Sequence, residues 1–396
     1  QGRNDHARED PRPPGRSTAV RYLHVASVPL RTDITTDDTL AIGRLGAVLG
    51  LRDEPGPVAL GPRGPYLVTS VVDTRRVLTD SDAFLFPVDV TRRATTGEHA
   101  MITRLRPDQV ARGLATFEHE LSLAATAWDA DDAADAMRVL REPVARSTTD
   151  AVLGPLEPAD RDRVADLVLA WIDALAPVIA AARPPRRWSG TRRAERAARV
   201  DLERALADLR VDAPTVSAVE LAAGVQVPIA AGAWLLVLLA ENPAAAAEAA
   251  RRGLAVETAW ETLRLRPPTW VTARMTAREV ALEHGTVPGH AVVLVSPLLL
   301  GRGPDLLPAG SADPSLFDPA RWDGADVRPG AWLPFGAGHH ACPGRSLGLA
   351  QLTALARWGL DRQVVLTQPV RIDQTRGIFP SPALLRCGAL PSSPEE

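Results

Sequence analysis

Apolar residues recur every three to four positions along residues 108–230, with Arg and Asp between them. This period is typical of amphipathic helices and predicts helical structure over most of the stretch. Residues 183–199 interrupt the pattern with two prolines and many arginines. We interpret the interruption as an exposed loop that leads into another helix, whose charges form a solvated face.

The most apolar stretch is 221–240, where Gln226 is the only clearly polar side chain. Its length reaches that of a transmembrane helix, about 20 residues. However, Glu220 and Glu241 flank it, whereas an inserted helix usually has a basic bias on one side. Two glycines and a proline also interrupt it. A helix that is apolar all round is also typical of a protein core, so we predict a central buried helix.

Short apolar, β-branched runs predict strands at 66–71, 280–282 and 291–295, the last two among turn-forming Gly and Pro residues. After the first strand, Asp73 is predicted to cap a short helix. Helical character returns after Gly344. The predicted fold class is therefore mainly α with small β-sheets, one near the start and another in the last third.

The polar, Arg- and Pro-rich residues 1–18 predict a disordered N-terminal tail. No later break in composition marks a second domain, so we expect a single domain over 19–396. No secretory signal is found at the start, and two cysteines cannot form a disulfide-rich scaffold. We therefore expect a cytoplasmic protein in a reducing compartment.

The charge composition excludes some functions. The formal net charge is −3, which is unlike the strongly basic balance of a dedicated nucleic-acid binder. All 45 basic residues are Arg, a bias that indicates a bacterial source with a GC-rich genome. The lack of Lys also excludes a Schiff-base lysine and a P-loop lysine.

The segment with the richest chemistry is 333–345, Leu-Pro-Phe-Gly-Ala-Gly-His-His-Ala-Cys-Pro-Gly-Arg. Cys342 stands just before a predicted helix, whose free N–H groups and dipole would stabilise a thiolate. A thiolate is a good ligand for iron. Glycines let the backbone pass close to a flat group, and His340 can donate to a carboxylate. The alternative is a Gly-rich turn that carries a buried cysteine.

This segment resembles the haem-binding loop of the cytochrome P450 family, Phe-Gly-x-Gly-x-His-x-Cys-x-Gly, at every fixed position. The resemblance implies haem b (iron protoporphyrin IX), with Cys342 as the axial, metal-binding thiolate. It also implies that Phe335 packs near the sulfur and that His340 meets a propionate. The haem-binding residues that it assigns are Phe335, Gly336, Gly338, His340, Cys342 and Gly344.

Three further residues extend the resemblance to a structural network. Glu261 and Arg264 lie at i and i+3 on a predicted helix and look like the family's Glu-x-x-Arg pair. Arg321, within Phe-Asp-Pro-Ala-Arg-Trp, resembles the Arg that completes the network and locks the segment carrying the Cys loop. Arg274 lies where the family places a second propionate partner, and a surface Arg is the alternative.

The resemblance runs from about residue 60 to the end. It implies the cytochrome P450 fold, a triangular α-rich prism with a central buried helix. Haem would lie between that helix and the helix after the Cys loop. Residues 153–175 look like the turn and helix that cover the substrate.

The sequence departs from the family on the central helix. The family's Ala-Gly matches Ala223-Gly224. In the family, an acid and then Thr usually follow two and three residues after that glycine. Here Gln226 and Val227 stand in those places and Pro228 follows. Neither side chain can relay protons near neutral pH, and Pro228 should kink the helix. Since 221–240 contains no Asp, Glu, Ser or Thr, no shifted register restores the pair. We count these three positions among the catalytic ones.

The helix that usually contributes His-x-x-x-Arg to a propionate is also atypical. His99 and Arg104 are its nearest candidates, one residue away from that spacing, with Thr103 where Arg is expected. Both are assigned to haem binding, and a surface loop is the alternative for His99.

The resemblance implies a haem-thiolate oxidoreductase that tailors a small-molecule secondary metabolite, such as an antibiotic. Because the acid–alcohol pair is replaced, we expect atypical oxygen activation or oxygen-independent haem chemistry. The alternatives are an ordinary ferredoxin-dependent monooxygenase, a hydroxylase or epoxidase with substrate- or water-assisted proton delivery, and a non-catalytic helper. The substrate has no readable sequence code.

The expected partners follow from the same reading. No Gly-x-Gly-x-x-Gly nucleotide fingerprint is found, so electrons would come from a ferredoxin and its reductase. Arg345 and Arg357 are candidates to attract an acidic ferredoxin, and solvated surface arginines are the alternative. We expect a monomer that binds neither a membrane nor nucleic acid.

Overall fold

The computed structural model describes residues 43–86, 104–128, 133–181, 183–303, 306–311, 313–324, 333–374 and 377–389. The predicted tail at 1–18 and the candidate His99 lie outside these residues.

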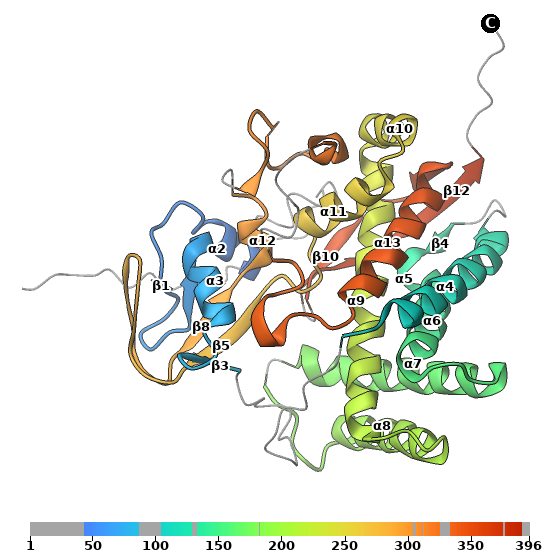
Figure 1. Cartoon of the computed structure of the whole chain (residues 1–396), viewed down its shortest axis with the longest axis horizontal. Helices are drawn as coiled ribbons and strands as arrows, with labels where there is room; N and C mark the ends of the chain where they lie inside the picture. The colour runs from blue at the N-terminus through green and yellow to red at the C-terminus, as the bar shows by residue number, and fades with distance from the viewer. Residues whose placement is uncertain are drawn as a thin grey trace, which may run out of the picture.

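Helices make up most of the described chain, which confirms the mainly α prediction (Figure 1). The longer ones are α4 (Pro107–Trp128), α6 (Arg141–Leu153), α7 (Pro158–Ala180), α8 (Gly190–Asp208), α9 (Pro214–Glu241), α10 (Pro243–Arg252), α11 (Ala255–Leu265) and α13 (Arg345–Leu360). Shorter ones are α2 (Gly43–Leu49), α3 (Val71–Thr79), α5 (Ala136–Val139), α12 (Pro297–Leu300) and the 3-10 turns η2 (Pro319–Trp322) and η4 (Gly338–His340).

The strands form small sheets beside this helical mass. The largest has the order β1-β2-β8-β5-β3, in which β2 and β8 run parallel and the other neighbours antiparallel. Its strands are β1 (Val58–Ala59), β2 (Tyr66–Val68), β3 (Phe84–Leu85), β5 (Thr272–Thr276) and β8 (Val292–Val295). This sheet, with α2 and α3, lies to one side of the long helices (Figure 1).

The remaining strands pair antiparallel in smaller sheets with the orders β4-β12-β9, β10-β11 and β6-β7. They are β4 (Ala134–Asp135), β6 (Val280–Leu282), β7 (Gly285–Val287), β9 (Arg362–Leu366), β10 (Arg371–Asp373), β11 (Phe379–Ser381) and β12 (Leu384–Ala389). The predicted strands at 280–282 and 291–295 correspond to β6 and β8, and the first predicted strand ends early, at Val68.

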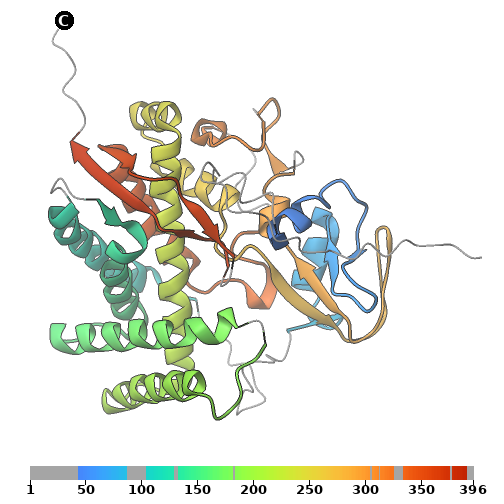
Figure 2. The same cartoon turned by 180° about the vertical axis from the view of Figure 1, so that it is seen from behind.

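The long helix α9 crosses the middle of the molecule, with other helices and strands around it (Figure 2). By length and composition it is the one described helix that could cross a membrane, but 72% of its most apolar window is buried inside the protein. Every residue from 229 to 239 is buried. The prediction of a central core helix is therefore confirmed.

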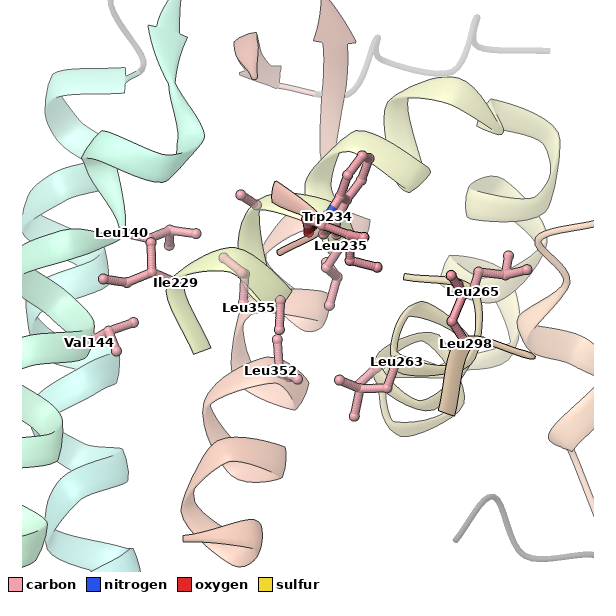
Figure 3. Packing of buried hydrophobic residues seen from close by; sticks show 14 of the residues in the cluster. Leu140, Val144, Ile229, Trp234, Leu235, Leu263, Leu265, Leu298, Leu352 and Leu355 are labelled. Atoms are coloured by element: carbon pink, nitrogen blue, oxygen red, sulfur yellow. Dashed lines mark hydrogen bonds between the residues drawn. The ribbon is translucent and has the colours of Figure 1, made fainter. Parts of the chain in front are cut away.

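Small residues let α9 lie close to its neighbours. A Cβ on Gly232 would stand 2.9 Å from side-chain atoms of both Leu140 and Leu355, which come from two different elements packed beside α9 (Figure 3). On α13, a Cβ on Gly359 would stand 2.9 Å from Leu239. These close approaches hold α13, the helix that follows the Cys loop, against α9.

The predicted cap of α3 is wrong. Ser70, not Asp73, is the N-cap, and its hydroxyl accepts from the Asp73 N–H at 3.1 Å. The helix therefore begins three residues earlier than expected. Asp73 is buried in the first turn, where its carboxylate accepts from the Glu283 backbone N–H at 3.2 Å. Burial is the largest effect on this carboxyl group and raises its pKa.

Candidate functional site

The loop that precedes α13 folds back on itself and exposes the Cys342 thiol. The Cys342 N–H donates to the Phe335 carbonyl at 2.8 Å, which closes the loop around η4. Gly344 is the N-cap of α13, so the thiol stands just before a helix, as the sequence predicts. The cysteine is thereby fixed at the open end of a helix that is itself packed on α9.

The backbone conformation of this loop requires glycine at two positions. Gly336 and Gly338 both have φ of +68°, a conformation that disfavours other residues. A Cβ on Gly338 would stand 2.6 Å from the Leu78 carbonyl oxygen at the end of α3. The close approach of α3 is therefore one reason for glycine at 338, and a flat group beside Gly338 stays a prediction.

The electrostatics of the thiol differ from the expectation. Burial by surrounding protein raises the pKa of Cys342, although solvent reaches the sulfur. The Gly344 N–H and the charge of Arg345 act in the opposite direction, but more weakly. A helix start alone therefore does not make this thiol acidic. A bound cation in place of the proton would add the missing stabilisation of the thiolate.

Two aromatic rings hold Arg345 beside the cysteine. Its guanidinium carbon lies 5.6 Å from the Phe335 ring centroid and 5.8 Å from that of Trp260. The two rings meet edge to face at 5.9 Å. Phe335 therefore lies next to the loop cysteine and orients a cation on the side of α13.

Arg274 is a buried cation without an acidic partner among the described residues. Its side chain is 3% exposed, and its Nη1 donates to the Ala273 carbonyl at 2.8 Å. Burial lowers its pKa. The guanidinium carbon lies 5.1 Å from the Phe86 ring, which in turn lies 4.8 Å from the His340 ring. The two predicted propionate partners, Arg274 and His340, thus contact the same aromatic ring.

Glu261 forms the centre of a buried network. Its side chain is fully buried, and Arg264 donates to both of its oxygens, at 2.7 and 2.8 Å. Arg321 donates Nε at 3.1 Å to one of these oxygens. The structure therefore brings together the three residues that the sequence assigns to the network, although Arg321 is 60 residues away from Glu261.

Two further donors to Glu261 were not anticipated. The Trp322 indole N–H donates at 2.8 Å and the Asp318 backbone N–H at 3.0 Å. The signal was present in the sequence, because Trp322 directly follows Arg321 and a buried indole needs an acceptor. Arg264 also donates to the carbonyls of Gly301 and Pro314, at 2.8 and 2.6 Å. The network therefore ties α11 to the segment that leads toward the Cys loop.

The middle of α9 presents an open face. Val227 is 38% exposed and Ala223, one turn earlier, is also exposed, although 229–239 is wholly buried. Gln226 is half-buried. Since α13 packs on α9, the exposed thiol and the exposed face of α9 belong to neighbouring elements.

The helix continues through Pro228 without a break (Figure 1). Pro228 has no N–H to donate to the carbonyl of Gly224, four residues earlier. The Thr148 hydroxyl of α6 donates to that carbonyl instead, at 3.2 Å. A side chain of the neighbouring helix α6 thus replaces the hydrogen bond that Pro228 cannot donate. The sequence did not predict this bond, because the donor comes from another element.

Arg104 is exposed, at the start of a described segment. The next residue, Leu105, donates its N–H to the Pro343 carbonyl at 3.4 Å, so this segment lies beside the Cys loop. No contact of the Arg104 side chain with another predicted haem residue is found in the described chain.

Comparison with known proteins identifies the family. A family model described as cytochrome P450 matches residues 220–376, which contain the network and the Cys loop. These 157 residues are similar to the cytochrome P450 family. The chain is 44% identical over 108 residues to cyclooctat-9-en-7-ol 5-monooxygenase of Streptomyces melanosporofaciens, covering 25% of this chain and 23% of that P450. It is 33% identical over 164 residues to cyclooctatin synthase of the same organism, covering 35% of each chain. The matches thus span about a quarter to a third of these relatives.

Solved P450 structures share the fold over a much larger part of the chain. The open form of EryK from S. erythraea has a TM-score of 0.69 at 21% identity, covering 91% of this chain and 99% of that one. CYP175A1 from Thermus thermophilus has a TM-score of 0.70 at 22% identity, covering 88% of this chain and 96% of that one. The predicted fold class is confirmed by these likenesses.

The described residues fit haem b, the cofactor of the cytochrome P450 family. The exposed Cys342 sulfur suits axial ligation of iron. The buried charge of Arg274 lacks an anion, which a propionate would supply. Apart from chain neighbours and the helix's own backbone, no atom of the described residues lies within 4 Å of a Cβ built on Gly344 or Gly348, so the start of α13 is open at these two positions.

Proposed function

We propose that this P450 is a haem-thiolate oxidoreductase that tailors a small-molecule secondary metabolite. The observation that carries the proposal is the exposed Cys342 thiol, held beside the Gly344 N–H and the Arg345 charge. A non-catalytic helper would have no need of this arrangement. The similarity to the two Streptomyces enzymes supports the class of reaction, and the name of the first specifies an alcohol as substrate.

Bound haem would supply the oxidative chemistry, and the protein residues would position and tune it. Cys342 would donate its sulfur to iron, while Arg345 and the Gly344 N–H reduce the negative charge on that sulfur. Arg274 and His340 would hold the propionates. The rigid Glu261 network would keep the Cys loop in place.

The wild-type protein, reduced and treated with carbon monoxide, is expected to show the absorption band typical of thiolate-ligated haem. Purified protein is reconstituted with hemin and the spectrum is recorded before and after reduction. Failure to take up hemin, or a carbon-monoxide complex with the spectrum of a histidine-ligated haem, would contradict the proposal and favour the helper.

We further propose that proton delivery in this P450 is atypical. Gln226 can form hydrogen bonds but does not titrate near neutral pH, and Val227 is apolar and exposed toward the open face of α9. Dioxygen use by the wild type would then depend on ordered water or on a substrate hydroxyl, or it would give way to peroxide. The ordinary monooxygenase with assisted proton delivery stays the alternative.

The double substitution Gln226→Glu with Val227→Thr tests this proposal. With a surrogate ferredoxin and reductase, the wild type is expected to release most reducing equivalents as hydrogen peroxide. The double variant should release several-fold less peroxide per NADPH, since a positioned acid and alcohol speed proton transfer by about 10²-fold or more. Peroxide release and NADPH consumption are measured together, and Val256→Thr, at an exposed position of α11, is the control. Tight coupling of the wild type would contradict atypical delivery.

We propose a ferredoxin and its reductase as the electron donors. Arg345 and Arg357 are both exposed on α13, on the helix that follows the ligand cysteine. Exposed cations there would steer an acidic partner.

A further inference from the structure

Glu220 is an unusual carboxylate in this protein. It lies half-buried on α9, and no hydrogen bond or ion pair reaches it from the described residues. Arginine is abundant, and other helical carboxylates use it: on α8, Arg199 contacts both Glu195 and Glu203, at 3.6 and 2.8 Å. Burial raises the pKa of Glu220, with no compensating donor or cation. A half-buried carboxylate without a partner costs stability, so a ligand is a natural source of the missing donor.

The position of Glu220 on α9 connects it with the open face of that helix. At about 100° per residue, Val216, Glu220, Ala223 and Val227 fall within about 60° of one another on the helix surface. Ala223 and Val227 are exposed, and Val216 and Glu220 are partly so, while the rest of the helix becomes buried after Pro228. The stripe is therefore apolar and small, with Glu220 as its single acidic side chain.

The length of the site follows from the rise of the helix per residue. Glu220 and Val227 are seven residues apart, which is about 10 Å along the axis. Helical side chains tilt toward the N-terminus, so the carboxylate points away from Val227 and is too remote to serve as its proton donor. A rigid molecule of several fused rings spans such a distance. Ligand pockets of this kind are mostly apolar, with a few polar groups that fix the orientation of the ligand.

We propose that Glu220 accepts a hydrogen bond from the hydroxyl group of a largely hydrocarbon substrate and so orients it along α9. The inference rests on the proposed function and names the substrate class of the same site. Glu220 would act as a specificity-determining residue: an alcohol satisfies the carboxylate, whereas the parent hydrocarbon would bury it without a donor. The hydrocarbon would bind more weakly than the alcohol, because it leaves the buried carboxylate without a hydrogen-bond donor.

Androstanol and its parent hydrocarbon androstane serve as probes, since they are rigid, span the required length and differ in one hydroxyl. Affinities are measured by isothermal titration calorimetry on the haem-reconstituted full chain. The wild type is expected to bind androstanol about tenfold more tightly than androstane, a ratio in the range of a hydrogen bond to a charged acceptor. Glu220→Ala should reduce the ratio to about one, and Glu220→Gln, whose amide oxygen still accepts, should keep part of it.

Glu241→Ala is the matched control, because Glu241 is an exposed glutamate at the opposite end of the same helix. It should leave the ratio unchanged. Equal affinities for the two probes in the wild type, no binding of androstanol, or an undiminished ratio in Glu220→Ala would overturn the proposal. Calorimetry does not depend on the haem spectrum. A protein that keeps the alcohol preference without the thiolate band would therefore overturn only the proposed function.

Discussion

The Cys342→Ala variant is expected to lose the thiolate band of the reduced carbon-monoxide complex completely. The physical reason is that, of the two cysteines in the chain, Cys342 alone is exposed, and alanine offers no atom that can bind iron. Hemin uptake should also fall, because Arg274 and His340 would have to hold the group by its propionates alone. The spectrum of the reconstituted variant, recorded beside the wild type, is the measurement.

Cys387→Ala provides the matched control for this experiment. Cys387 is buried in β12, and it lies outside the Cys loop. Its replacement should keep the thiolate band while lowering stability modestly, by about 1 kcal/mol. A Cys342→Ala protein with an unchanged Soret spectrum, or a Cys387→Ala protein without the band, would show that the ligand is misassigned.

The Glu261→Gln variant is expected to lose about 3–5 kcal/mol of unfolding free energy, enough to unfold many domains of ordinary stability. Glutamine has nearly the same shape but leaves Arg264 and Arg321 as buried charges without a counterion. Its amide can accept at one oxygen only, whereas Glu261 accepts five hydrogen bonds through two oxygens. Urea unfolding, followed by circular dichroism, measures the loss.

Glu257→Gln is the control on the same helix. Glu257 lies in the first turn of α11 and takes part in none of the network bonds. Its substitution removes only a favourable contact with the helix dipole, worth at most about 1 kcal/mol. If the two variants unfold at the same urea concentration, the network contributes no more than an ordinary surface charge, and its assigned structural role is wrong.

Helix geometry explains why part of the network was predictable. Residues three apart share a helix face, so the Glu261–Arg264 pair follows from local sequence once α11 is recognised. Arg321, Trp322 and the Asp318 N–H reach Glu261 across about sixty residues of chain. Only the resemblance to the P450 family indicated Arg321. The position of Trp322 directly after Arg321 was a signal for the indole donor, and nothing indicated the backbone donor.

The structure of α9 could likewise be predicted only in part from the sequence. Its uniform hydrophobicity was enough to predict a central buried helix, because solvent exposure of so many apolar side chains is unfavourable at every position. The replacement of the acid–alcohol pair by Gln226 and Val227 was also evident in the sequence. The donor that compensates for Pro228 was not, since Thr148 belongs to α6.

The sequence by itself determined the local chemistry: a cysteine just before a helix, an i, i+3 ion pair and a core helix without a proton relay. These depend on residue type and spacing along one element. Only the tertiary structure decided that burial outweighs the helix start at the Cys342 thiol, that the approach of α3 requires glycine at 338, and that Glu220 has no partner among the described residues. Desolvation, close backbone approach and the absence of a counterion all depend on which distant segments pack together, which no local pattern encodes.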